Sequence, residues 1–252
     1  MPFQKLKSVD LYYEIFGTGE PIIFIHGSLS NGNETFKKQI PFFESTYQCI
    51  CVDLRCHGRS NGNIIEWDTP ILSQDIIEFI TANRLSGVHL VGHSMGGDVA
   101  MYCALNRPDL IASVVLISDW AAVNNHVTAY LDRLNHEIIY HQYFSKLIVK
   151  MEMRYGDEWK AFVMRTIWNC STYPQFSEND LKQIIAPVLL IRGNLDEMVL
   201  DTEVERLKNN LPNFEYSEIR NGNHFLHSQR ANFNSVNHII TDFLANHKQT
   251  VV

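Results

Sequence analysis

The chain lacks the cysteine spacing of a metal-binding or disulfide-bonded protein. It has five cysteines and no C-x-x-C pair. An odd number without that spacing disfavours both a structural zinc site and a disulfide framework. Cys49 and Cys51 alternate along a predicted strand and so point to opposite faces. We expect reduced thiols in a cytoplasmic protein, with no metal and no organic cofactor.

Long apolar runs and an excess of positive charge are also missing. No stretch approaches the roughly 18 residues of a membrane-spanning helix. The N-terminal segment MPFQKLKSVDLYYEIFGTGE lacks the apolar core of a secretory signal. The formal net charge is -7, and no basic cluster is interleaved with aromatic residues. These features argue against nucleic acid or a membrane as partner and favour a small molecule. The oligomeric state stays open.

What the chain does have is a regular alternation of apolar strands and amphipathic helices in its first half. Strands are predicted at 11–16, 21–27, 47–54, 87–92 and 111–118, and helices near 34–44, 70–84 and 95–106. Continuous Val, Ile and Leu strands separated by helices are typical of a parallel sheet that is covered on both faces. The fold class is therefore α/β, with a mostly parallel central sheet flanked by helices.

The alternation stops between about residues 120 and 176, where helical segments rich in Tyr, Met, Phe and Trp replace it. It resumes with a strand in 186–194, a helix at 202–210, a strand at 213–220 and a last helix at 238–247. The simplest organisation is a single domain spanning residues 1–252, with a helical lid inserted at about 120–176.

The segment VHLVGHSMGGDVA, residues 88–100, places a serine at the junction of a predicted strand and a predicted helix. Its G-x-S-x-G pattern is that of a nucleophile elbow, a sharp turn that exposes a serine above the sheet. We expect Gly92 and Gly96 to remove collisions in this turn, and Gly97 to let the helix lie close to the sheet. By itself the motif is equally compatible with a plain turn. Its position after a strand favours Ser94 as a nucleophile.

A serine nucleophile needs a base, and the base needs an acid that orients it. His224, in NGNHFLH, follows the strand that ends at Arg220, and Asp196, in GNLDEMV, follows the preceding strand. The order Ser, Asp, His is that of α/β-hydrolases. Asp119, in LISDW, also follows a strand. It is an alternative acid, or it caps the first lid helix. His227 is interpreted as the start of the final helix.

Acyl chemistry also needs hydrogen-bond donors for the developing oxyanion. The backbone N–H groups of Ser28, in the HGS segment 26–28, and of Met95, the residue after the serine, are the candidates. His26 is expected to tie its own loop by hydrogen bonds.

Five segments together resemble the α/β-hydrolase fold superfamily, in particular its lidded, esterase- and lipase-like serine hydrolases. They are HGS (26–28), DLRCHGRS (53–60), GHSMGG (92–97), GNLDEMV (193–199) and GNHF (222–225). The resemblance implies the triad Ser94, Asp196 and His224. Cys56 is a departure, because the turn of the family usually reads D-x-R-G-H-G-x-S. The thiol there suggests a turn that tolerates a side chain, and a second nucleophile is the less favoured alternative.

The resemblance implies a serine hydrolase that cleaves a small to medium carboxylic ester through an acyl-enzyme. Lactones, thioesters and carbon–carbon bonds remain alternative substrates, since fold does not select among them. A ligand-binding receptor with slow turnover is the alternative from another class. The lid is expected to set specificity through residues such as Tyr143, Met151 and Trp168. Which of these three faces inward stays open.

Overall fold

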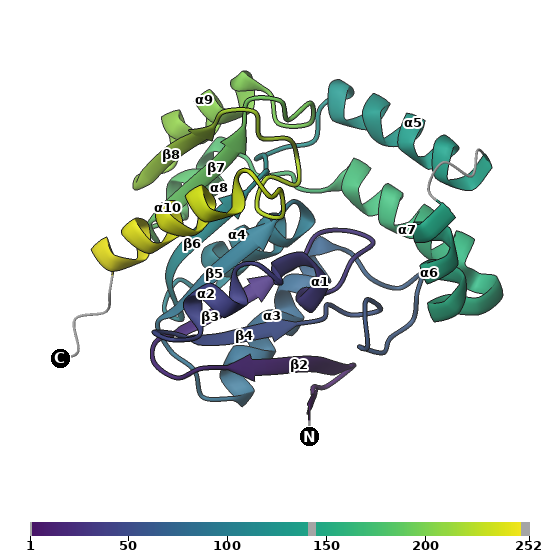
Figure 1. Ribbon diagram of the computed structural model, residues 1–252, viewed down its shortest axis with the longest axis horizontal. Coiled ribbons are helices and arrows are strands. Elements are labelled where there is room, and N and C mark those ends of the chain that lie inside the picture. The colour runs from purple at the N-terminus through teal and green to yellow at the C-terminus, as the bar shows by residue number, and fades with distance from the viewer. Residues whose placement is uncertain (1, 141–144, 248–252) are drawn as a thin grey trace.

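The computed structural model describes residues 2–140 and 145–247, and an eight-stranded sheet forms its centre (Figure 1). The strand order is β1-β2-β4-β3-β5-β6-β7-β8. Neighbouring strands from β4 to β8 are parallel, and β1 and β2 pair antiparallel at one edge. The predicted mostly parallel sheet is thus confirmed. The strands are β1 (Phe3–Lys5), β2 (Asp10–Phe16), β3 (Pro21–Ile25), β4 (Gln48–Val52), β5 (Val88–His93), β6 (Ile111–Ile117), β7 (Val188–Gly193) and β8 (Phe214–Ile219).

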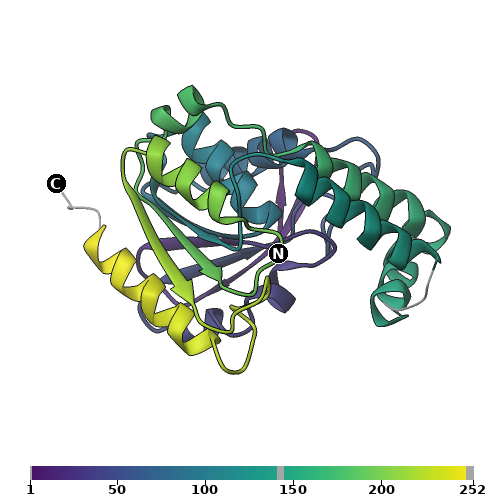
Figure 2. The same ribbon diagram turned by 90° about the horizontal axis from the view of Figure 1, so that it is seen from above.

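Helices cover both faces of this sheet, since alternate residues of each buried strand enter two separate apolar clusters. One face packs on α1 (Gly32–Phe36), α2 (Ile40–Phe43) and α10 (Phe233–Asn246). The other packs on α3 (Thr69–Ala82), α4 (Met95–Asn106), α8 (Glu178–Gln183) and α9 (Asp201–Asn210). Figure 2 shows α10 on one side of the sheet, opposite the pair α8 and α9.

The insertion between β6 and β7 folds as α5 (Asn125–Tyr140), α6 (Ser145–Tyr155), the 3-10 turn η1 (Gly156–Glu158) and α7 (Trp159–Thr172). These helices lie together beyond one end of the sheet (Figure 1). A single β-bridge between Ala122 and Gln175 closes the base of the insertion. The two ends of the insertion are therefore paired with each other next to the sheet.

Several boundaries differ from those predicted. The helix expected at 34–44 is two short helices, because Pro41 has no N–H to continue the hydrogen-bond ladder. Strand β1 and helix α8 were not expected, although Ser177 and Asp180 form a capping box at the start of α8. The final helix begins at Phe233, so the interpretation of His227 as its first residue is wrong. In the described part of the chain, no helix is long and apolar enough to cross a membrane.

Candidate active site

Ser94 occupies a strained turn between β5 and α4, with φ at 51° and ψ at -129°. Positive φ is costly for a residue with a side chain. The turn is held by close backbone contacts: a Cβ at Gly92 would lie 2.3 Å from the carbonyl oxygen of Gly96. A Cβ at Gly96 would lie 2.1 Å from the carbonyl oxygen of Ile25. Both glycines are thus required sterically, as the sequence predicts.

The role of Gly97 is more specific than close packing of helix on sheet. A Cβ there would lie 2.1 Å from Oδ2 of Asp119. Gly97 therefore makes room for a carboxyl group that is completely buried beneath the first turn of α4.

Asp119 does not cap the first lid helix, so that expectation was wrong. The side chain of Asn124 accepts from the backbone N–H of Val127 at 3.0 Å and performs that role. Asp119 instead accepts from the N–H of Trp120 at 2.8 Å and hydrogen-bonds to the buried carboxyl of Asp98. Burial raises the pKa of Asp119 to about 7 and that of Asp98 well above its usual range, so the pair retains a proton.

We expect this pair to make stability fall as pH rises. A carboxyl with a raised pKa in the folded state binds a proton that the unfolded chain releases, so the free energy of unfolding decreases between about pH 4 and 7. Asp98→Asn removes one of the two charges and offers an amide N–H to Asp119. It should reduce the loss of stability between pH 5 and 8 by roughly 1 kcal/mol or more, since one pKa unit corresponds to about 1.4 kcal/mol. Denaturant titrations at both pH values measure this.

The matched control is Asp109→Asn, which alters an exposed carboxylate paired with Arg107. An unchanged pH dependence in Asp98→Asn would show that the pair does not titrate in this range.

Asp196 and His224 form an ion-pair geometry at the carboxyl ends of β7 and β8. Nδ1 of His224 lies 3.1 Å from Oδ2 and 3.2 Å from Oδ1 of Asp196. The N–H of Met198 donates to the same carboxylate at 3.0 Å. Burial tends to raise the pKa of Asp196, but His224, the N–H of Met198 and the hydroxyl of Ser118 together lower it. The carboxylate is therefore ionised at neutral pH.

His224 lies beside the elbow because its loop is bonded to the residue before Ser94. Nε2 of His93 lies 2.9 Å from the carbonyl oxygen of His224, which can only accept a hydrogen bond. The two imidazole rings are 5.2 Å apart between centroids. Ser94 is 7% exposed. The structure thus gathers the three predicted residues at one edge of the sheet, and Asp119 contacts a different partner.

The loop after β3 packs directly against the elbow. A Cβ at Gly27 would lie 3.3 Å from Cβ of Ser94. Within the described residues, neither the N–H of Ser28 nor that of Met95 donates to a protein acceptor. His26 ties this loop as expected: its Nε2 accepts from the N–H of Leu54 at 3.0 Å and its Nδ1–H donates to the carbonyl of Gly27 at 2.7 Å. These two backbone N–H groups are therefore candidate donors beside the serine.

Cys56 holds a left-handed conformation with φ at 63° and carries its side chain inside the protein. Its Sγ donates to the carbonyl of Asn63 at 3.2 Å. Burial raises the pKa of this thiol to about 12. The thiolate is the reactive form of cysteine, and this raised pKa keeps Cys56 protonated. The structure therefore disfavours Cys56 as a second nucleophile.

The three lid residues singled out from the sequence have different environments. Met151 is buried and lines a cavity of about 310 Å³ with Leu29 and Tyr155, between α6 and the loop after β3. Trp168 is 45% exposed, with the guanidinium of Arg165 3.9 Å from its ring centroid. Tyr143 lies outside the described residues. Met151 is the lid residue that faces a cavity.

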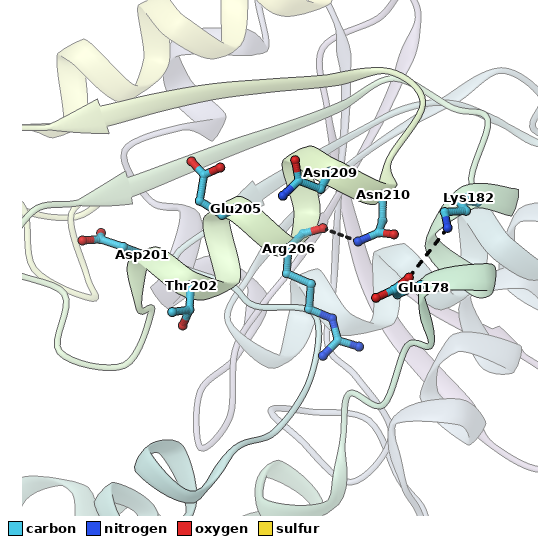
Figure 3. A pocket seen from close by; sticks show the side chains of 8 residues that line it. All are labelled: Glu178, Lys182, Asp201, Thr202, Glu205, Arg206, Asn209 and Asn210. Atoms are coloured by element: carbon cyan, nitrogen blue, oxygen red, sulfur yellow. Dashed lines mark hydrogen bonds and ion pairs between the residues drawn. The ribbon is translucent and has the colours of Figure 1, made fainter.

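A larger hollow, of about 720 Å³, lies between α8 and α9 (Figure 3). It is lined by charged and amide side chains, including Glu178, Lys182 and Arg206, and by no histidine or cysteine. Across the described ranges, no group of three or more His, Cys, Asp or Glu side chains could hold a metal ion.

Residues 20–165 match the family model of the alpha/beta hydrolase fold. Since that match spans more than half of the chain and the sheet and elbow have the expected geometry, the chain belongs to the α/β-hydrolase family.

The proteins that it resembles carry different names. It is 26% identical to the uncharacterized hydrolase YugF of Bacillus subtilis, over 95% of this chain and 96% of that protein. It is 32% identical to ethanol acetyltransferase 1 of Cyberlindnera fabianii, over 44% of this chain and 33% of that protein. It thus spans less than half the length of some of the curated relatives it matches. The solved structure of Est816, titled as an N-acyl homoserine lactone degrading enzyme, superimposes with a TM-score of 0.76 and 21% identity, covering 96% of this chain and all of that one.

Proposed function

We propose that the protein is a serine hydrolase that cleaves a small to medium carboxylic ester through an acyl-enzyme. The observation that carries this proposal is the 3.1 Å contact between Asp196 and the imidazole of His224, beside a serine held at positive φ. An ionised carboxylate next to Nδ1 keeps the proton on that nitrogen. The lone pair of Nε2 then remains available to take the proton of Ser94.

In the proposed reaction, Ser94 Oγ attacks the acyl carbon while His224 takes its proton. The oxyanion is stabilised by the free N–H groups of Ser28 and Met95, each worth about 3–4 kcal/mol in such sites. His224 then protonates the leaving alcohol, which departs and leaves an ester of Ser94. Water attacks this ester with His224 as base, the acid is released and the proton returns to Ser94. Asp196 stays ionised throughout and stabilises the imidazolium.

The substrate class follows from the cavity and from the relatives. A cavity of about 310 Å³ is at the lower end of the range for small-molecule sites. Leu29, Leu147 and Met151 form its apolar part, and Glu34, Lys150 and Arg154 are charged residues of its wall. The names of the relatives include acyl transfer to ethanol and degradation of an acyl lactone. Transfer of an acetyl group to ethanol makes a carboxylic ester, and a lactone contains one. All five thiols are buried and free, which supports the cytoplasm as the proposed location.

The test is a panel of p-nitrophenyl esters of increasing acyl length, each assayed with and without a serine-directed phosphonate. Multiple turnovers that the phosphonate abolishes are expected, with a preference for short or medium chains. A receptor would instead release at most one slow equivalent of p-nitrophenol per protein. Faster turnover of lactones or thioesters than of these esters would change the proposed substrate class and leave the proposed mechanism unchanged.

We expect Met151, and not Trp168, to set the chain-length preference. Met151→Ala enlarges the cavity beside Leu29, so the ratio of kcat/KM for a longer ester to that for acetate should change by about tenfold, the effect of one or two methylenes in an apolar pocket. Trp168→Ala alters an exposed side chain of the same lid and serves as the control. Equal effects of the two substitutions on this kcat/KM ratio would show that the cavity is not part of the substrate site.

A further inference from the structure

His93, the residue before the proposed nucleophile, is buried and makes a hydrogen bond to the residue that carries the proposed base. Its Nε2 lies 2.9 Å from the backbone carbonyl oxygen of His224, which is 131 positions away in the chain. This hydrogen bond joins the end of β5, where Ser94 follows, to the loop between β8 and α10. The placement of the base relative to the nucleophile therefore depends on it.

His224 is held from two directions. Asp196 contacts Nδ1 of its ring at 3.1 Å, and the same side of the loop is bonded through the N–H of Asn221 and the side chain of Asn194 at 2.7 Å. His93 holds the main chain of His224 from the side of the elbow. A general base needs both the orientation of its ring and the position of its main chain, because a misplacement of about 1 Å can cost about a hundredfold in rate.

The chemical state of His93 follows from its partner. A carbonyl oxygen only accepts hydrogen bonds, so Nε2 carries the hydrogen and Nδ1 carries a lone pair. Nδ1 faces the Cα of Gly27, since a Cβ there would lie 2.9 Å from it. Burial and the nearby imidazoles of His227 and His224 keep the pKa of His93 well below its usual value. His93 is therefore a neutral donor at neutral pH.

The neutrality of this donor matters because the rings of His93 and His224 are 5.2 Å apart between centroids. A positive charge at that distance would oppose protonation of His224 and weaken it as a base, since like charges repel. A lysine or arginine at position 93 could donate the same hydrogen bond, but it would carry this charge. A buried imidazole supplies the N–H without the charge.

The ring of His93 is held in its orientation by the side chains around it. The ring of His227 packs on it with centroids 4.3 Å apart, and the ring of Phe225 lies at 5.5 Å. Gly27 contacts Nδ1 and leaves no Cβ that would displace the imidazole. Packing therefore directs the Nε2–H at the carbonyl of His224.

We propose that His93 is a positioning residue for the base. Its Nε2–H, and not only the bulk of its ring, holds the main chain of His224 where the imidazole can take the proton of Ser94. This rests on the proposed function, in which His224 is the general base. His93 itself exchanges no proton during the reaction and acts only through the hydrogen bond to the carbonyl.

The test separates the N–H of His93 from the volume of its side chain. His93→Gln keeps an amide N–H at the end of the side chain, and His93→Met has a similar length without a donor. His93→Phe is a second donor-free variant, which keeps a ring against His227. The matched control is His89→Met. His89 is another buried histidine of β5, and its Nδ1 lies 2.7 Å from the hydroxyl of Ser113. Circular dichroism melts show which variants fold.

We expect His93→Met and His93→Phe to lower kcat for p-nitrophenyl acetate by about tenfold to hundredfold, with KM changed by less than about twofold. His93→Gln should stay within about threefold of the wild-type kcat, because it retains the donor. His89→Met also loses a buried hydrogen bond and should lower the melting temperature, but its kcat should stay within about twofold of wild type. The difference between the Gln and Met variants measures the donor, since both lack the ring.

Proton NMR provides a readout that a loss of stability alone does not move. The Nδ1–H of His224, bonded to Asp196, should give a far-downfield signal, which is identified by its absence from Asp196→Asn. We expect this signal in the wild type, in His93→Gln and in His89→Met. In the donor-free variants of His93 it should broaden through exchange with water, because the loop that carries His224 is held at one side only.

Equal kcat values in His93→Gln and a folded donor-free variant overturn the proposal, as does a loss of kcat in His89→Met as large as that in His93→Met. An NMR signal that is unchanged in the donor-free variants overturns it as well. Failure of the proposed function is a different result. In that case the wild-type protein turns over no ester and does not react with a fluorophosphonate at Ser94. The role of His93 in catalysis then falls, while the NMR comparison still shows whether its N–H holds the loop.

Discussion

Ser94→Ala is expected to lower turnover of p-nitrophenyl esters by about 10⁴-fold to 10⁶-fold, the range seen when a serine hydrolase loses its nucleophile. The hydroxyl is the only group removed. Ser94 has no side-chain cap bond to α4, so its loss leaves the hydrogen bonds of the helix start intact. Alanine tolerates the positive φ at this position about as poorly as serine does, so the strain of the turn is unchanged.

A fluorophosphonate provides the matching measurement. It should add once to the wild-type protein, at Ser94, and not at all to the alanine variant. Circular dichroism melts of both proteins serve as the folding control. Residual turnover near the wild-type level, or labelling at Cys56 or another residue, would contradict the assignment of the nucleophile.

The second large effect is expected at the acid. Asp196→Asn should reduce kcat by about four orders of magnitude, as in serine proteases, where an amide stabilises the wrong imidazole tautomer. Here Asp196 bonds Nδ1 of His224 at 3.1 Å. Asparagine can present an N–H to that nitrogen and so move the proton to Nε2, where it blocks acceptance from Ser94.

Asp119→Asn is the matched control, since it makes the same chemical change after the neighbouring strand. Its carboxyl is bonded to Trp120 and Asp98, so we expect less than about tenfold loss of kcat. Initial rates of the two folded variants decide whether Asp196 or Asp119 orients His224. The reverse ranking would assign the acid to Asp119, and small losses in both variants would mean that neither aspartate orients His224.

Much of the fold could be predicted from the sequence because its signals are local. Continuous Val, Ile and Leu segments such as 188–191 predict buried strands wherever they occur. The glycines around Ser94 mark a turn in which backbone atoms approach to within 2.3 Å of any added Cβ. The position of His224 could be predicted too, because it follows a strand and the carboxyl ends of parallel strands lie at one edge of the sheet.

Position alone could not decide between the two aspartates, since both follow parallel strands. Asp119 lies under α4 because Gly97, far from it in sequence, leaves space for its carboxyl. Asp98 was not singled out at all, as an acidic residue in the first turn of a helix has an ordinary explanation. Whether Asp98 is solvated or buried against another carboxyl depends on how α4 packs on β6.

By itself the sequence determined the α/β class, the elbow and the order of the candidate catalytic residues. Only the tertiary structure decided which carboxylate contacts His224, which lid residue faces a cavity, and that the rings of His93 and His227 pack against each other. The physical reason is that strand type and turn geometry depend on neighbours along the chain. Burial, pKa and hydrogen-bond partners depend on groups brought together from distant segments, as His93 and His227 are, with ring centroids 4.3 Å apart.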